Sequence, residues 1–346
     1  MDPSTSQLNP NPKTSQDIPG PQWDTPDGKL PSRLFATGRY PVASLNLYAK
    51  LEHLTFLHHH LKDSPVFDQI RKSCFGKLFD IPSPRCPTSG KLIHQLITRQ
   101  LLTKQKHEMW MVFGGQPFRF GLPEFEAITG LPCGEFEEDC IEEVSPPLGT
   151  DIDATWREIV SDNPNTTIDD IATLFKKPEE MESMTDDRKF KLALIIIVDG
   201  VLLTKHQFPK PTARYVTMLS DVQTFLQYPW GRESFKATIE TLRPAPKGKK
   251  NQIDPIIKFR QKLQSGTMRL QGFPIALQLL AFKSIPILKE SLQSSSEEHT
   301  LLHIPGEEIA THAGLKLKHV LLAETHQSVR VLLCEYTFCC VCPYYH

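Results

Sequence analysis

The stretch KLALIIIVDGVLLTK, residues 191–205, combines an apolar run with an acid and a glycine, as the catalytic strands of some phosphatases do. Phosphatases of the haloacid-dehalogenase type need two aspartates two residues apart, because one attacks phosphorus and the other acts as general acid. Ile197 occupies the first of these positions, so only Asp199 remains. Upstream, Asp186 and Asp187 suit the first turn of a helix. We therefore predict a buried helix without catalysis, in which Asp199 pairs with a basic side chain or a backbone amide of a neighbouring helix.

Two further groups have residue types that can bind ligands. Gly114 and Gly115 lack the Gly-x-Gly-x-x-Gly or Gly-Lys-Ser/Thr context that cradles phosphate, and we interpret them as a hairpin turn. His58, His59 and His60 stand near the end of a helical pattern, where three consecutive side chains point in different directions and do not chelate one ion together. Cations there complement the helix C-terminus. The sequence therefore predicts no metal ligands and no cofactor.

The cysteines are better interpreted as reduced thiols than as a disulfide framework, because the chain is long and begins without an export signal. The late ones are dense enough to consider zinc, yet their spacing matches no common zinc module. The eight residues are Cys74, Cys86, Cys133, Cys140, Cys334, Cys339, Cys340 and Cys342.

Basic residues gather between Glu240 and Leu270, where they could contact phosphates or act as a nuclear import signal. Glu240 and Asp254 are the only acids in this stretch, and Phe259 alone offers an aromatic ring for base stacking. We therefore treat the stretch as a candidate nucleic-acid or import patch, with a solvated linker as the alternative. The patch comprises Arg243, Lys247, Lys249, Lys250, Lys258, Arg260 and Lys262, followed by Arg269.

The elements that would position these residues are mostly helices, because apolar residues recur at helical spacing along most of the chain. Residues 108–121, with the two glycines in the middle, predict a β-hairpin instead. The fold class is therefore mainly α with a small β-hairpin (α+β), a multi-helix globular domain with a disordered N-terminal tail. Helical patterns cover residues 44–61, 64–75, 89–104, 122–131, 168–177, 186–205, 213–228, 231–242, 255–264 and 272–288.

Composition changes divide the chain. Residues 1–30 are rich in Pro, Ser, Thr, Asn and Gln and predict a flexible tail. Residues 31–290 form the predicted folded domain, with a division into two lobes near 135–185 as one alternative. Residues 291–333 predict a linker and a short C-terminal element, and residues 334–346 an irregular tail.

Composition also bears on location and partners. The 346 residues carry a formal net charge of -1, which argues against a wholly basic nucleic-acid binder. The run Leu192–Val198 is far shorter than the roughly 20 residues of a bilayer span. The N-terminus has neither the cationic start nor the apolar core of a secretory signal. We expect a protein that is neither secreted nor held in a membrane.

Several blocks in order resemble the plant domain of unknown function numbered nineteen eighty-five. They cover roughly residues 30–290 and include LPSRLFATGRYP, FGKLFDIP, SGKLIHQLITRQLLTKQKHEMWMVFGGQPFRFGLPEFEAITGLPCG, RKFKLALIIIVDGVLL, YPWGRESF and QGFPIALQLLAFKSIPIL. The resemblance implies a flowering-plant protein derived from Mutator-like transposable elements. In that family the domain often precedes a SUMO-protease-like, Ulp-type cysteine peptidase domain.

The family's peptidase carries a Trp after its catalytic His and a Cys within Asp-Cys-Gly. Neither pattern occurs in this chain, since Asp139 and Cys140 are followed by Ile141. We therefore expect no enzyme but a non-catalytic interaction module, with a protein partner, nucleic acid as a further possibility and no membrane. Its expected location is the nucleus, with the cytoplasm as the alternative. The competing hypothesis is that the chain is an accessory part of a SUMO-protease-like peptidase system that acts in proteolysis or deSUMOylation.

Overall fold

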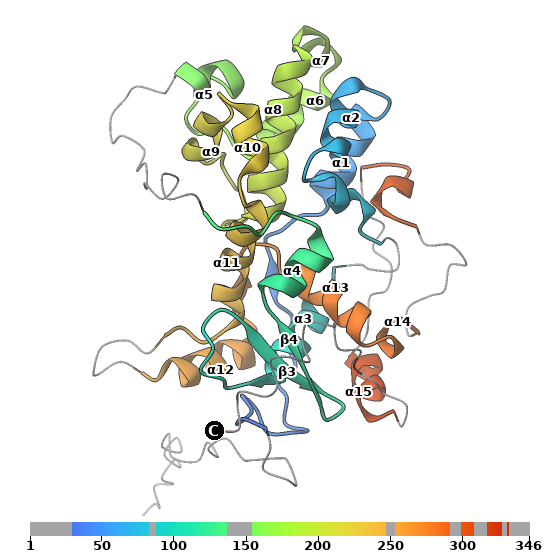
Figure 1. Ribbon diagram of the computed structural model, residues 1–346, viewed down its shortest axis with the longest axis vertical. Coiled ribbons are helices and arrows are strands. Elements are labelled where there is room, and N and C mark those ends of the chain that lie inside the picture. The colour runs from blue at the N-terminus through green and yellow to red at the C-terminus, as the bar shows by residue number, and fades with distance from the viewer. Residues whose placement is uncertain are drawn as a thin grey trace, which may run out of the picture.

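The computed structural model shows an elongated, mainly helical protein with one small antiparallel sheet, which confirms the predicted fold class (Figure 1). The predicted tails at 1–30 and 334–346 lie outside the described residues, apart from Leu30. None of the described helices combines the length and the apolar character that a bilayer span requires. The structure describes residues 30–82, 88–136, 154–246, 253–290, 299–307, 317–326 and 331.

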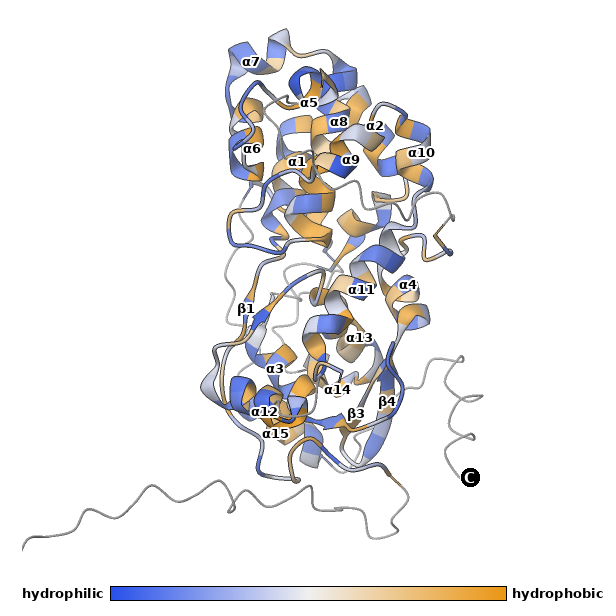
Figure 2. Cartoon of the chain, turned by 90° about the vertical axis from the view of Figure 1, so that its left-hand side faces the viewer, coloured by the Kyte–Doolittle hydropathy of each residue, from blue (hydrophilic) through white to orange (hydrophobic). Residues whose placement is uncertain are grey.

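The upper half of the molecule in Figure 1 is built around helix α8 (Asp186–Ile197). Every residue from Leu192 to Ile197 is buried, and the helix packs against α1, α2, α5 and α6. An apolar surface on all sides is expected of a central helix. Figure 2 shows the hydrophobic colouring concentrated along α1 and α8. The other helices of this half are α1 (Glu52–Leu61), α2 (Pro65–Lys72), α5 (Ala154–Ile159), α6 (Ile168–Lys176), α7 (Pro178–Ser183), α9 (Ala213–Met218) and α10 (Val222–Gln227).

The lower half holds the sheet and the remaining long helices (Figure 1). Strands β3 (Met109–Phe113) and β4 (Gln116–Phe120) form the predicted hairpin, and β2 (Gln100–Leu101) adds a third antiparallel strand. Gly114 and Gly115 have φ angles of 54° and 78°, which suit a two-residue turn and confirm its prediction. The helices of this half are α3 (Gly90–Thr98), α4 (Leu122–Thr129), α11 (Trp230–Leu242), α12 (Pro255–Ser265), α13 (Ile275–Ser284), α14 (Ile287–Glu290) and α15 (Leu317–Thr325).

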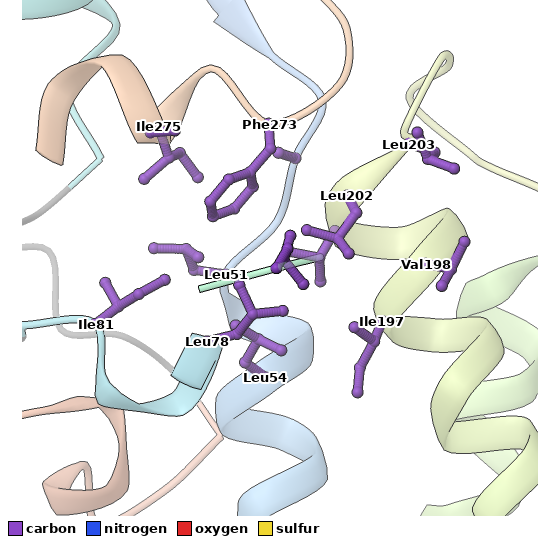
Figure 3. Packing of buried hydrophobic residues seen from close by; sticks show 14 of the residues in the cluster. Leu51, Leu54, Leu78, Ile81, Ile197, Val198, Leu202, Leu203, Phe273 and Ile275 are labelled. Carbon is purple, nitrogen blue, oxygen red and sulfur yellow. The ribbon is translucent and has the colours of Figure 1, made fainter. Parts of the chain in front are cut away.

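The two halves share one buried core. Near the junction, Leu51 and Leu54 of the α1 region lie beside Leu202 and Phe273 (Figure 3). Short 3₁₀ turns, η1 (Gly76–Asp80) and η4 (Leu301–His303), contact each other and α1. The proposed domain limits and the division near 135–185 stay predictions.

Two short strands, β1 (Asn46–Leu47) and β5 (Arg269–Leu270), pair in parallel. This pairing explains why the helix predicted from residue 44 begins only at Glu52. The backbone around Asn46 is used for a distant strand, so tertiary pairing overrides the local helical pattern. Strand β5 also fixes the position of Arg269, one of the basic residues described next.

Candidate binding site

A pocket of about 820 Å³ lies where α11 ends and α12 begins, within the basic stretch that the sequence singles out. Four cationic side chains line it against one carboxylate, that of Glu240. This excess of positive charge sits on a chain whose net charge is close to zero, so the pocket is a local electropositive site. The cationic residues are Arg243, Lys258, Lys262 and Arg269.

Local sequence positions α12 along the pocket. Asp254 caps the helix by accepting a hydrogen bond from the Ile256 N–H, and Pro255 occupies its first turn. Phe259 and Leu263 are buried, and Phe259 also borders the pocket. Lys258 and Lys262, also four residues apart, line the pocket from the same face of the helix. The two lysines therefore place two positive charges on one side of the pocket.

A buried histidine holds the end of α12 in place. His94 of α3 makes a hydrogen bond of 2.9 Å from its Nε2 to the carbonyl oxygen of Leu263. Burial lowers the pKa of His94, so the ring is neutral at neutral pH and its N–H donates to that carbonyl. This link connects the helix of the pocket to the core of the lower half.

Arg243 enters the pocket from the end of α11. Its Nη1 atom is buried and has no hydrogen-bond partner among the described residues. Burial lowers the pKa of Arg243, while the charge of Glu108 opposes that shift. Arg269, from β5, donates a hydrogen bond of 3.3 Å to the Tyr48 hydroxyl. Arg243 and Arg269 thus bring two guanidinium groups to the pocket lining, and guanidinium groups form charge-assisted hydrogen bonds with anions.

Apolar side chains complete the pocket. Ile253, which lines it, leaves 67% of its surface exposed. Met268 and two prolines also contribute to the lining. Phe259 is only 6% exposed, so its ring is not open for base stacking. The pocket thus combines a cationic lining with an exposed apolar residue at its edge.

Only some of the basic residues singled out in the sequence line the pocket. Arg243, Lys258 and Lys262 line the pocket together with Arg269. Arg260 does not line it, because its guanidinium lies over the Phe35 ring, 5.1 Å from the centroid. Lys247, Lys249 and Lys250 lie outside the described residues. The exposed Ile253 directly before the Asp254-Pro255 helix start is the signal in the sequence that could have indicated an apolar component.

Asp199 lies in a π-helical turn, η3 (Val198–Leu202), that continues α8. Its carboxylate is buried and accepts two hydrogen bonds from Thr212: from the backbone N–H at 2.9 Å and from the hydroxyl at 2.7 Å. Thr212 directly precedes α9, so the predicted pairing with a backbone amide is confirmed. Burial raises the pKa of Asp199 to about 6, although the Thr212 hydrogen bonds oppose the shift. The carboxylate thus accepts hydrogen bonds at the N-terminus of α9.

Two cysteines lie within the described residues, and both are free thiols. Burial raises the pKa of Cys74 to about 12 and that of Cys133 to about 12. A nucleophilic cysteine needs a lowered pKa, so neither environment activates a thiolate. The other six cysteines lie outside the described residues.

Residues 97–241 match the family model described as Domain of unknown function (DUF1985). The match is to the family that the sequence blocks resemble, and it covers a narrower range than the 30–290 expected from them. It ends at Thr241, so most of the pocket lining lies just beyond it. No curated protein and no solved structure matches the chain.

Proposed function

We propose that this chain is a non-catalytic protein-interaction module. Its pocket takes an acidic segment of a partner protein that also presents an apolar side chain. The observation that carries the proposal is the pairing of four cationic side chains with the exposed Ile253 around one pocket. Solvent-exposed apolar residues beside convergent charges are a common feature of peptide-binding sites.

The lining favours a peptide over a nucleic-acid strand. Sequence-independent binding of single strands combines a positive groove with aromatic platforms, and the ring of Phe259 is buried. Ile253 instead offers exposed apolar surface, which a phosphate backbone does not use. Carboxylates and guanidinium groups form charge-assisted hydrogen bonds, so Arg243 and Arg269 fit Asp and Glu side chains.

The experiment compares three fluorescent probes of equal charge on the full chain by anisotropy. One is a peptide of alternating Glu and Leu, the second has Ser in place of Leu, and the third is a single-stranded oligonucleotide. We expect the Glu-Leu peptide to bind at least about fivefold more tightly than the Glu-Ser peptide, because burying several apolar side chains adds roughly 1 kcal/mol or more. Both interactions weaken as salt increases.

Two outcomes would contradict the proposal. Equal affinity for the two peptides would remove the apolar component. Preferential binding of the oligonucleotide, with a steep linear dependence of log K on log salt, would assign the pocket to nucleic acid instead.

The remaining parts of the proposal rest on the family resemblance. They are a plant protein of transposon origin and a nuclear location. The competing hypothesis is that the chain is an accessory part of a SUMO-protease-like peptidase system. Cleavage of a fluorogenic SUMO precursor by the isolated chain tests the non-catalytic part. We expect no turnover. Turnover that disappears when all cysteines are replaced by serine would show that the chain is itself a thiol peptidase.

A further inference from the structure

A second cluster of polar side chains lies on the upper half, away from the pocket. One nitrogen each of His59 and His60 and one carboxylate oxygen of Glu307 all lie within 4.8 Å of one another. The two histidines come from the last turn of α1, and Glu307 follows η4. His58, the third consecutive histidine, lies against the Phe67 ring instead, with centroids 5.2 Å apart. Two of the three consecutive histidines therefore lie close to Glu307, a residue that is distant from them in the sequence.

Glu307 is held in place by several contacts. Its Oε1 lies 2.7 Å from Nε2 of His60, and its Oε2 accepts from the Lys176 ammonium at 2.6 Å. The Thr55 hydroxyl donates to the Glu307 backbone carbonyl. The hydrogen bond from Lys176, reinforced by His60, lowers the pKa of Glu307, so the side chain is a carboxylate at neutral pH. The donor set is thus two imidazoles and one anionic oxygen.

We propose that His59, His60 and Glu307 bind a zinc ion. Two imidazoles and one carboxylate form a donor set that suits Zn²⁺, with a fourth position left for water. Tetrahedral zinc, with ligands at about 2.0–2.1 Å, places its ligand atoms about 3.3–3.4 Å apart. The ligand atoms of the cluster lie close enough for small side-chain rotations to reach that geometry. The ion replaces the direct contact between His60 and Glu307.

Lys176 competes with the ion for Glu307. Its ammonium is a positive charge next to the carboxylate, and half of its side chain is exposed. The lysine can therefore swing into solvent when the metal binds, at a cost in affinity. Bound zinc would join the end of α1 to the segment after η4, so it would also stabilise the fold by mass action.

The experiment measures zinc affinity of the full chain by competition with a chromophoric chelator under reducing conditions. His59→Ala removes one ligand but leaves the contacts of Glu307 with Thr55, His60 and Lys176 intact. We expect it to weaken zinc binding at least about tenfold without changing the melting temperature of the metal-free protein. Lys176→Met is expected to strengthen binding, and the matched control His58→Ala to leave it unchanged.

Cobalt distinguishes this site from the cysteines. We expect Co²⁺ to bind in a His59-dependent way without the near-ultraviolet band of thiolate ligation. The proposal fails if His59→Ala binds zinc as tightly as the unaltered chain, if no zinc binding is detected, or if the cobalt spectrum shows thiolate ligands that persist in His59→Ala.

Discussion

Asp199 precedes Gly200 in the chain, His53 packs against Gly200, and the pKa values of Asp199 and His53 are shifted in opposite directions. Burial raises the pKa of Asp199 from 3.8 to about 6. Burial, with the charge of Lys50, lowers the pKa of His53 from 6.5 to about 4, against the attraction of Asp169. Between pH 4 and 6, the folded protein therefore binds a proton more tightly than the unfolded chain at Asp199 and less tightly at His53.

These shifts give opposite contributions to stability. The contribution of Asp199 to the free energy of unfolding decreases as pH rises from about 4 to about 6, because the carboxylate must become charged while buried. The contribution of His53 to the free energy of unfolding decreases instead as pH falls from about 6.5 to about 4, because the buried ring must then become charged. Asp199→Asn should therefore make stability rise more steeply with pH between 4 and 6. Urea unfolding at pH 4, 5 and 6 measures this slope.

The substitution His53→Gln serves as a control of opposite sign. It should flatten or reverse the rise in stability with pH, because only the Asp199 contribution remains. An Asp199→Asn slope equal to that of the unaltered chain would show that the carboxylate is not buried as described.

Helix α8 and its π-helical end show why an aspartate and a glycine follow the apolar run. Asp199 closes the start of α9, and Gly200 lets α1 approach. A Cβ atom at Gly200 would lie 2.8 Å from Cδ2 of His53 and 3.1 Å from Cγ2 of Ile168. In the motif that resembles a phosphatase strand, Asp199 therefore caps a neighbouring helix and Gly200 allows two helices to pack closely.

Gly200→Ala should destabilise the protein by about 1–3 kcal/mol, because the added methyl group overpacks a close approach of α1 and α6. The comparison variant is Gly134→Ala, where a Cβ would meet nothing within 4 Å. Chemical denaturation of both variants measures the difference. A loss no larger in Gly200→Ala than in Gly134→Ala would contradict the close packing.

Elements with strong local signals could be predicted from the sequence. The apolar run of α8, with Asp186 and Asp187 in its first turn, predicts a buried helix, and Gly114-Gly115 predicts the hairpin. The basic stretch also contains all four cationic residues that line the pocket. These features depend on neighbours in the sequence, which is the information that periodicity and capping patterns carry.

Features that join distant segments could not be predicted. The parallel pairing of Asn46–Leu47 with Arg269–Leu270 involves only two residues on each strand, too few for a periodic signal. The approach of Glu307 to His59 and His60 depends on how η4 packs on α1. From helical spacing alone, the consecutive histidines were predicted to point in different directions. Tertiary packing brings two of them close to the carboxylate of Glu307.

At the scale of the whole molecule, a buried ion pair attaches the C-terminal helix α15. Arg99, fully buried at the end of α3, contacts Glu324 through Nη2 at 2.5 Å and Nε at 2.9 Å. The guanidinium also donates to Gln95 and lies 4.0 Å from the centroid of the Tyr40 ring. This pair joins α15 to the core across the stretch that follows α14.

Glu324→Gln should destabilise the protein by about 1–3 kcal/mol, because it leaves a buried guanidinium with a weaker partner. Amide hydrogen exchange should show the largest loss of protection within residues 317–325. The double variant Arg99→Met/Glu324→Met should recover much of the loss, since an apolar pair carries no uncompensated charge. An unchanged stability of Glu324→Gln would contradict this role of the ion pair.

The binding of an acidic, apolar peptide at the pocket is the central claim, and charge reversal on α12 tests it most directly. Lys258→Glu/Lys262→Glu places two carboxylates where the lining has two ammonium groups. Lys236→Glu changes an exposed lysine of α11 outside the lining and serves as the control. In anisotropy titrations with the Glu-Leu peptide, the double variant should lose at least about tenfold in affinity while Lys236→Glu keeps it. Equal affinities for the double variant and the unaltered chain would contradict the claim.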